Sequence, residues 1–361
     1  PQSPIPNPQS PGKVNIKKHI YFFFKYSYIY PLKNLKKNNK LFELNSFLQC
    51  ICHILPIVNK IKGNYNKIKE QKEFKECLRN GKCLTSSFQA LIDKIWPDDA
   101  NKSKEKEYKR TESSEEILKM IYKIFPQYNE NQQLLINFFL MRLHTELNKA
   151  ENNNQNNNIL NPESNKNIAL NNYLKYFQEQ NMSIISDYFF GTYYTSLTCA
   201  FCKYNQFKFF PYIFGYYSIN QVYQYKIITW KNGQNALYRN MNINLYEVNI
   251  YDCLYFDQQI KTSFQLCKNC GNTIIHYYQN IIFVTPIILS FIFNKNDFIS
   301  YNINFLIEEN INVNFFIEDK NITNYELIGI IFYFSPNRYI AYSKNPIDKR
   351  WYCYDDEIYL F

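Results

Sequence analysis

Apolar residues recur at helical spacing through the first 150 positions of the chain. The spacing is clearest in residues 41–61, where apolar side chains are three or four positions apart, and it predicts a buried helix. The apolar positions of this helix are Leu44, Phe47, Leu48, Ile51 and Leu55. Pro56 should bend or end the helix, because proline has no backbone N–H to donate. Similar patterns predict further helices near residues 67–79, 87–95, 114–124 and 132–148.

The second half of the chain has a different pattern. From about Tyr188 onward, runs rich in Tyr, Ile and Phe alternate with short polar breaks, as in residues 280–293 and 325–334. Such runs predict β-strands. A polar, Asn-rich insert at residues 151–167 separates the two halves, and we interpret it as a solvated loop. Helices followed by a long antiparallel sheet indicate an α+β fold.

Composition and charge leave the class of partner open. With 46% hydrophobic and 20% charged residues over 361 positions, the chain is typical of a globular protein with a large core. The net charge of +10 admits an acidic partner but does not require one. A modest basic cluster comprises Lys33, Lys36, Lys37 and Lys40. We interpret it as a solvated loop, with phosphate contact as the alternative; Lys, Asn, Tyr and Phe all have codons rich in A and T, which weakens any nucleic-acid interpretation.

The start of the chain shows no secretion signal. Residues 1–14 are rich in Pro and Ser, so we predict a disordered lead-in there. The apolar residues 20–30 are interrupted by Lys25 and are too few to cross a membrane. We therefore expect an intracellular protein, cytoplasmic or nuclear, with reduced cysteines. The chain does not begin with Met, which fits a fragment or a processed form.

Two C-x2-C pairs stand out among the ten cysteines. They are Cys199 with Cys202, and Cys267 with Cys270. Each pair places two thiolates on one tight turn, so that both can bind the same tetrahedral Zn²⁺. Four cysteine ligands leave no open position for water, so we predict a structural zinc site. Four core thiols without a metal are the alternative. We expect His276, near the second pair, to lie on the surface and not to bind the metal.

Several segments in order resemble the ubiquitin-specific protease family. The segments are LNSFLQCICHI (44–54), NQQLLINFFLMRLHTELNK (131–149), DYFFGTYYTSLTCAFC (187–202), FQLCKNC (264–270) and the C-terminal residues 325–359. They resemble, in turn, the helix after the nucleophile, the glutamine-rich motif, the two zinc knuckles and the histidine box.

The resemblance implies a papain-like fold with a helical thumb, a β-rich palm and zinc-binding fingers. It implies a single domain over residues 15–361. Its parts are a thumb at about 31–150, the insert at 151–170, fingers and palm at 171–292, and the rest of the palm at 293–361.

The catalytic positions of that family are altered in this chain. The resemblance places Phe42 at the nucleophile position and Arg338 at the general-base position, with Asp355 at the position of the orienting carboxylate. No cysteine occurs between Pro1 and Gln49, and no histidine occurs after His276. A guanidinium cannot act as a general base, because it does not release its proton at any working pH. We hypothesise that Arg338 instead pairs with Asp355.

The motif that holds the ubiquitin tail is altered as well. Gln132 and Gln133 match the family, but Leu134 and Asn137 stand where the family has acidic residues that receive the basic tail. Tyr339 matches the aromatic residue of the histidine box and would border the same cleft. The resemblance therefore implies weakened ubiquitin binding.

Three functional hypotheses follow. The first is an inactive member of the family that binds ubiquitin or a ubiquitin-like protein, or serves as a scaffold. The second is an active deubiquitinase with a relocated nucleophile, for which Cys50 or Cys52 beside His53 would be the local candidates. These thiols lie inside a predicted core-facing helix, however, and fit small buried side chains better. The third is a basic RNA-associated module, which rests on charge alone.

Overall fold

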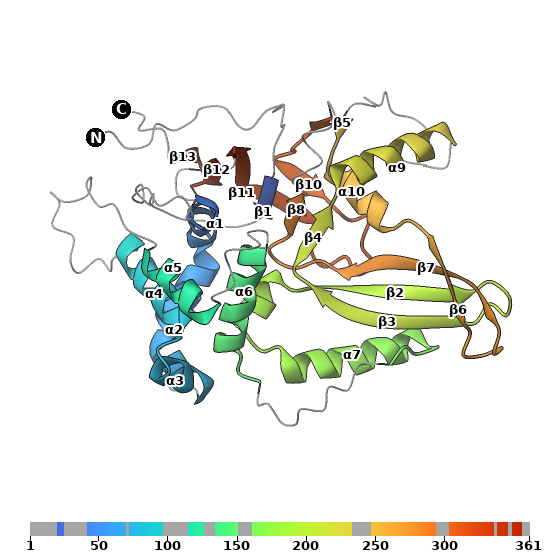
Figure 1. Cartoon of the computed structure of the whole chain (residues 1–361), viewed down its shortest axis with the longest axis horizontal. Helices are drawn as coiled ribbons and strands as arrows, with labels where there is room; N and C mark the ends of the chain where they lie inside the picture. Colours follow the sequence, from blue (N-terminus) through green and yellow to red (C-terminus); the bar gives the residue numbers. More distant parts are fainter. Residues whose placement is uncertain are drawn as a thin grey trace.

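The computed structural model describes residues 20–24, 42–69, 72–96, 115–125, 134–150, 161–232, 247–293, 303–335, 338–345 and 349–355. A bundle of helices lies on one side of a central sheet, and a second, elongated sheet extends away from both (Figure 1). This arrangement confirms the predicted α+β class. The predicted lead-in at 1–14, the Lys33 cluster, Gln132 and Gln133 lie outside the described residues.

The helical bundle is built from the predicted amphipathic segments and from the short helix α8, which the sequence analysis did not predict. Its helices are α1 (Phe42–Cys52), α2 (Leu55–Lys69), α3 (Lys72–Arg79), α4 (Leu84–Ile95), α5 (Glu115–Ile124), α6 (Leu134–Leu147) and α8 (Ile184–Phe189). Phe139 of α6 makes edge-to-face contacts with Phe47 and Phe88, with ring centroids 5.3 Å apart in both pairs. Pro56 lies in the first turn of α2, where its missing N–H needs no partner. The predicted single helix is therefore two helices that meet just before the proline.

The central sheet has the strand order β13-β12-β11-β1-β8-β4, and β10 also pairs with β11. These strands are β1 (Ile20–Phe24), β4 (Phe214–Tyr217), β8 (Ser290–Phe293), β10 (Asn310–Asn312), β11 (Asn324–Ser335), β12 (Arg338–Lys344) and β13 (Trp351–Asp355). One face of the sheet buries Ile331 and Ala341 in the core formed with α1. The other face buries Phe291 and Ile330 in a second core. Because α1 packs on β11 and β12, it lies beside the strands that the resemblance assigns to the histidine box.

The second core is closed by α9 (Ile219–Lys231) and α10 (Ile250–Asp257), together with the short parallel pair β5 (Glu247–Val248) and β9 (Asn304–Phe305). The two helices correct the expectation of an uninterrupted strand-rich half. Strand β4 also pairs with β8 in parallel, so among the described residues the predicted long antiparallel sheet is three sheets that include two parallel strand pairs.

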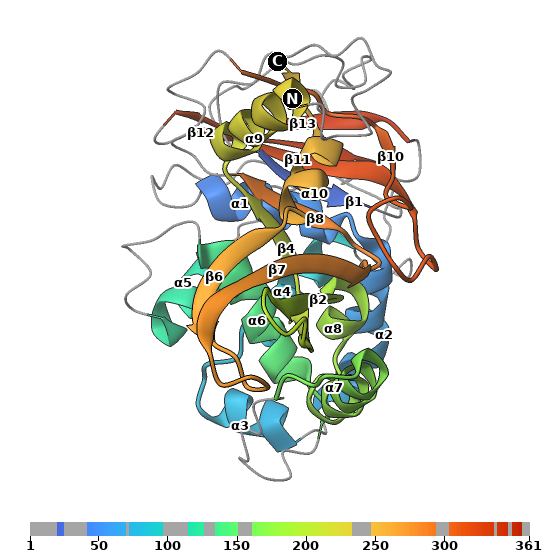
Figure 2. The ribbon, with the colours of Figure 1, turned by 90° about the vertical axis from the view of Figure 1, so that its right-hand side faces the viewer.

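The elongated sheet has the order β3-β2-β7-β6. Its strands are β2 (Gly191–Cys199), β3 (Asn205–Tyr212), β6 (Lys261–Leu266) and β7 (Thr273–Val284), and α7 (Lys166–Gln180) covers part of one face (Figure 2). Tyr173 of α7 packs against Tyr194 and Phe209 of the sheet.

The insert ends earlier than predicted. Glu163 forms a β-bridge with Phe207, and Asn165 caps the first turn of α7 with its side chain. Residues 161–167 are therefore structured, and the expected boundary at residue 171 falls inside a helix. None of the described helices combines the length and the apolar composition needed to cross a membrane.

Candidate functional site

The two cysteine pairs occupy matching turns at the far end of the elongated sheet. The backbone N–H of Cys199 donates to the carbonyl of Tyr204, and the N–H of Cys267 donates to the carbonyl of Asn272. In each turn the residue after the second cysteine donates its backbone N–H to the carbonyl of the first cysteine. This residue adopts a positive φ, which is 59° for Lys203 and 71° for Gly271. The two knuckles are therefore the same structure built twice.

The sheet brings the knuckles together. The first knuckle follows β2 and the second follows β6, and both of these strands pair with β7. All four Sγ atoms lie within 4.8 Å of one another, and Cys202 Sγ is 3.6 Å from Cys267 Sγ. Four sulfurs bound at 2.3 Å to one tetrahedral ion lie about 3.8 Å apart. The four cysteines therefore could hold a metal ion such as zinc.

The surroundings of the knuckles favour the thiolate at Cys267 and Cys202, whereas at Cys270 the backbone hydrogen bond with Asn272 is outweighed by desolvation and the neighbouring cysteines, which raise its pKa to about 11. Hydrogen bonding from the backbone of Cys270 lowers the pKa of Cys267 to about 6. The side chain of Asn269 lowers the pKa of Cys202 in the same way. Because only the thiolate binds metal, these hydrogen bonds lower the proton competition that the metal must overcome.

His276 is a correction to the sequence analysis. It is buried rather than exposed, it pairs with Cys199 across β2 and β7, and its Nδ1 lies 2.9 Å from the carbonyl oxygen of Ile274. A hydrogen bond from His276 also contributes to the lowered pKa of Cys267. The signal that was missed is strand pairing, since His276 and Cys199 are 77 positions apart (276 − 199) in the sequence.

The three residues that the resemblance assigns to the catalytic positions lie at the ends of elements. Phe42 is the first residue of α1, Arg338 is the first residue of β12, and Asp355 is the last residue of β13. Asp355 pairs directly with Ile340, which places positions 338 and 355 diagonally on one face of neighbouring strands. Such diagonal positions are about 7–8 Å apart, within reach of a long side chain.

Cys50 and Cys52 lie inside the protein. Both thiols are buried, and burial raises the pKa of each well above that of a free cysteine. His53 is buried as well, and desolvation lowers its pKa to about 4. Its ring nitrogens face the carbonyl of Gln49 and the hydroxyl of Tyr354, the latter at 3.4 Å. The imidazole is thus engaged away from both thiols, and the thiols keep their protons at neutral pH.

The residues of the expected tail-binding cleft are spread over two elements. Leu134 is the first residue of α6, and Asn137 is partly exposed one turn further along. Tyr339 is buried in the core between β12 and the helices. Its buried position, on the same strand as Arg338, fits a packing role in the core.

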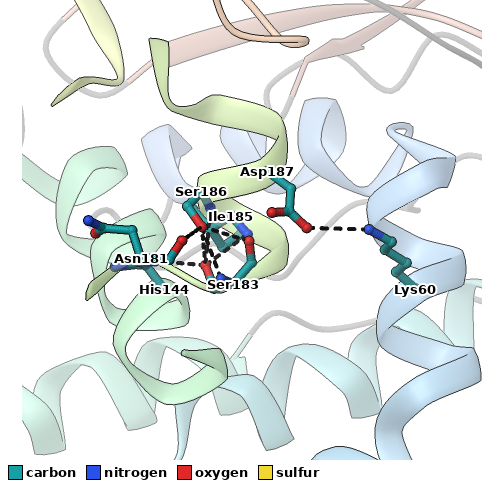
Figure 3. Close-up of polar contacts among 7 residues, drawn as sticks. All are labelled: Lys60, His144, Asn181, Ser183, Ile185, Ser186 and Asp187. Carbon is teal, nitrogen blue, oxygen red and sulfur yellow. Dashed lines mark hydrogen bonds and ion pairs between the residues drawn. The ribbon is translucent and has the colours of Figure 1, made fainter. Parts of the chain in front are cut away.

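A serine and a histidine that the sequence analysis did not pair also meet in the helical bundle (Figure 3). His144 Nδ1 lies 2.7 Å from Ser183 Oγ. The same oxygen accepts the backbone N–H groups of Ile185 and Ser186, at 3.1 and 3.0 Å, as the N-cap of α8. With both lone pairs occupied, the hydroxyl must donate to His144, which assigns Nδ1 as the acceptor. Burial lowers the pKa of His144, and the pair is therefore a structural cap, not an activated nucleophile.

The helical bundle contains a second buried side chain that caps the start of a helix. Glu146 accepts the backbone N–H groups of Leu84 and Thr85, at 3.0 and 2.7 Å, and thereby caps α4. Arg142 pairs with the same carboxylate at 2.7 Å. Arg142 also borders a cavity of about 350 Å³ next to Cys77 and His144. The polar groups that line the cavity are largely engaged in hydrogen bonds within the protein, so we assign the cavity no ligand.

Comparison with known proteins identifies the fold. The sequence profile of the ubiquitin carboxyl-terminal hydrolase family matches residues 37–359. Among solved structures, the SAGA Ubp8/Sgf11/Sus1/Sgf73 DUB module bound to monoubiquitin matches at a TM-score of 0.57 and 16% identity, over 91% of this chain and 64% of that one. The same module bound to ubiquitin aldehyde gives 0.57 and 16%, over 91% and 65%. A yeast SAGA DUB module gives 0.57 and 14%, over 91% and 64%. The chain thus spans just under two thirds of these relatives, and no curated protein matches it.

Proposed function

The chain belongs to the ubiquitin carboxyl-terminal hydrolase family, and from this premise we propose that it is a catalytically inactive member that binds ubiquitin or a ubiquitin-like protein. One observation carries the proposal. Phe42, which the resemblance assigns to the nucleophile position, is the first residue of α1, and no cysteine precedes Cys50 in the sequence. A helix N-terminus lowers the pKa of a thiol, but a phenyl ring has no atom that can attack a carbonyl.

The general base is missing in the same way. Hydrolysis by a thiol protease needs a histidine to take the proton of the nucleophile and pass it to the leaving amine. We propose that Arg338 holds that position and pairs with Asp355, which the diagonal register of β12 and β13 supports. In place of a nucleophile and a general base, the site would then hold an arginine–carboxylate ion pair, which transfers no proton.

The zinc site has a structural role in this proposal. Four thiolates would saturate a tetrahedral Zn²⁺, which leaves no position for a substrate or a water molecule. The ion would fix the far end of the elongated sheet, because it joins the β2–β3 turn to the β6–β7 turn.

The proposed partner follows from the family and from the altered cleft. Two of the similar solved structures are bound to monoubiquitin or ubiquitin aldehyde. In this chain Leu134 and Asn137 offer no carboxylate to a basic tail. Each lost charge-assisted hydrogen bond costs on the order of 1–3 kcal/mol, so we expect weak binding and an intracellular scaffold role.

A ubiquitin probe with an electrophilic C-terminus tests the proposal. We expect no covalent adduct by mass spectrometry, together with weak non-covalent binding of ubiquitin. The matched variant Phe42→Cys places a thiol at the helix N-terminus, and it should form an adduct if the cleft still admits the tail. An adduct of the unsubstituted protein at Cys50 or Cys52 would show that the nucleophile has moved and that the protein is an enzyme. Failure of both proteins to bind or react would show that ubiquitin is not the partner.

A further inference from the structure

His276 lies on the strand between the two knuckles. Strand β7 runs between β2 and β6 in the elongated sheet, and the knuckles follow β2 and β6. His276 is directly opposite Cys199 of β2 on one side and Ser263 of β6 on the other. Directly opposed residues point to the same face of a sheet, with Cβ atoms about 4.5–5.5 Å apart. Because Cys199 carries one of the four clustered sulfurs, the His276 ring lies on the face that carries the metal site.

The ring of His276 is buried and held in one orientation. Only 4% of the residue is exposed, and its Nδ1 lies 2.9 Å from the carbonyl oxygen of Ile274. A carbonyl oxygen only accepts, so Nδ1 carries the proton of this contact. The other nitrogen, Nε2, is then left for the hydrogen bond that His276 shares with Cys267. Histidines that bind metal are oriented in the same way, with one nitrogen donating to a backbone carbonyl and the other facing the ion.

The intact site needs no fifth ligand. Among the described residues, the four sulfurs alone lie within 4.8 Å of one another, and they complete a tetrahedron. His276 therefore stays beside the four-cysteine site, next to Cys267, and becomes a ligand only where one of the four sulfurs is missing.

The four cysteines differ in how firmly the fold protects them. The first cysteine of each knuckle is buried, and the second is partly exposed. The side chain of Asn269 forms a hydrogen bond with Cys202 and so holds one of the two outer sulfurs. Cys270 is held by the backbone of Asn272 and by the other cysteines. The space beside it is open, because a Cβ added at Gly271 would meet no atom within 4 Å. Cys270 is thus the ligand that the fold protects least.

We propose that His276 is a reserve ligand of the knuckle site, which binds the metal ion through Nε2 in place of Cys270 when that thiolate is lost. Three cysteines and one histidine are a common ligand set of structural zinc. The ion would take the place of the proton that Nε2 and the Cys267 sulfur share. The three remaining cysteines still join the two knuckles, so the cross-link between them persists. The inference rests on metal binding by the four cysteines and not on the proposed binding of ubiquitin.

Zinc affinity, measured on the full chain by competition with a coloured chelator, tests the proposal. We expect the unsubstituted protein and Cys270→Ala each to hold one zinc per chain, the variant more weakly. In the four-cysteine protein His276→Ala should weaken zinc binding by at most about tenfold, because it removes only a hydrogen-bond partner of a ligand. In the Cys270→Ala background the same change should weaken binding by more than about 100-fold, because it removes a ligand. Ser263→Ala, on the other side of β6–β7 pairing, is the matched control and should have little effect in either background.

Replacement of zinc by Co²⁺ reports the ligand set directly. The unsubstituted protein should give the spectrum of four thiolates. In Cys270→Ala the sulfur-to-metal charge-transfer band should weaken and the visible bands should move to shorter wavelength, because an imidazole nitrogen splits the metal d orbitals more than a thiolate does. Cys270→Ala combined with His276→Ala should lose this nitrogen signature.

Several results would overturn the proposal. One is an equal loss of affinity on His276→Ala in the two backgrounds, and another is a Co²⁺ spectrum of Cys270→Ala without the nitrogen shift. Cys270→Ser is measured beside the alanine variant, and failure of both to fold in the presence of zinc would refute the reserve role, since His276 should keep the ion bound. If the unsubstituted protein binds no metal, the zinc site itself is refuted and the inference with it. Binding of ubiquitin is measured separately by the probe experiment above, so the two proposals fail independently.

Discussion

Removal of metal from the four-cysteine site should destabilise the protein by an amount that follows from the length of chain between the linked cysteines. The site ties Cys202 to Cys267, which are 65 positions apart. The entropy that a cross-link removes from an unfolded chain grows with the logarithm of the number of residues in the closed loop. For this loop the lost entropy corresponds to about 4 kcal/mol at 25 °C. For a chain of 361 residues the entropy of unfolding is about 0.76 kcal/mol/K, so each kcal/mol lowers the melting temperature by about 1.3 °C and chelation should lower it by about 5 °C.

Scanning calorimetry with and without a zinc chelator measures this shift, and elemental analysis should find one zinc per chain beforehand. The variant Cys202→Ser supplies the control: it should melt near the chelated protein and lose little more when chelator is added. If the metal content falls to zero and the melting temperature is unchanged, the cross-link reasoning is wrong. If the purified protein holds no metal and binds none, the four cysteines are core thiols.

Three further predictions concern buried and paired charges. Glu146→Ala leaves Arg142 and the start of α4 without their acceptor and should cost about 3–5 kcal/mol in urea unfolding, with a smaller loss for Glu146→Gln. The pKa of His53 is lowered to about 4, so the folded state binds fewer protons than the unfolded state below pH 6.5. Stability should therefore fall as pH drops from 6.5 toward 4, by about 2 kcal/mol at pH 5, and His53→Phe should remove this part of the pH dependence. If Arg338 pairs with Asp355 through two parallel hydrogen bonds, Arg338→Lys should lose stability as Arg338→Ala does; a stable lysine variant would contradict the paired geometry.

The sequence predicted those features that depend on local spacing. Leu44, Phe47 and Ile51 recur at helical intervals, and the structure buries all three in α1. The two cysteine pairs were recognisable because each knuckle is a contiguous turn with its ligands three positions apart. Local periodicity and turn chemistry act over a few residues, so one sequence is enough to show them.

Features that depend on distant pairing were missed. Helix α9 contains Val222, Tyr223 and Ile227 among other β-branched and aromatic residues, and its sequence resembles a strand until the Ser218 cap and its packing are seen. The burial of His276 depends on its register with Cys199 across two strands. The contact between Glu146 and α4 joins residues about 60 positions apart. In each case tertiary contacts decide the outcome.

The positions that the resemblance assigns to catalysis differ in kind from the four cysteines. Phe42, Arg338 and Asp355 each end a helix or a strand. The knuckle cysteines also lie at strand ends, but four of them together would cross-link the sheet, and the loss of one would cost several kcal/mol. A chain that only binds a partner needs the cross-link and not the dyad. Under the proposed function, an intact set of four cysteines beside an altered nucleophile and an altered base is the combination that a binding role requires.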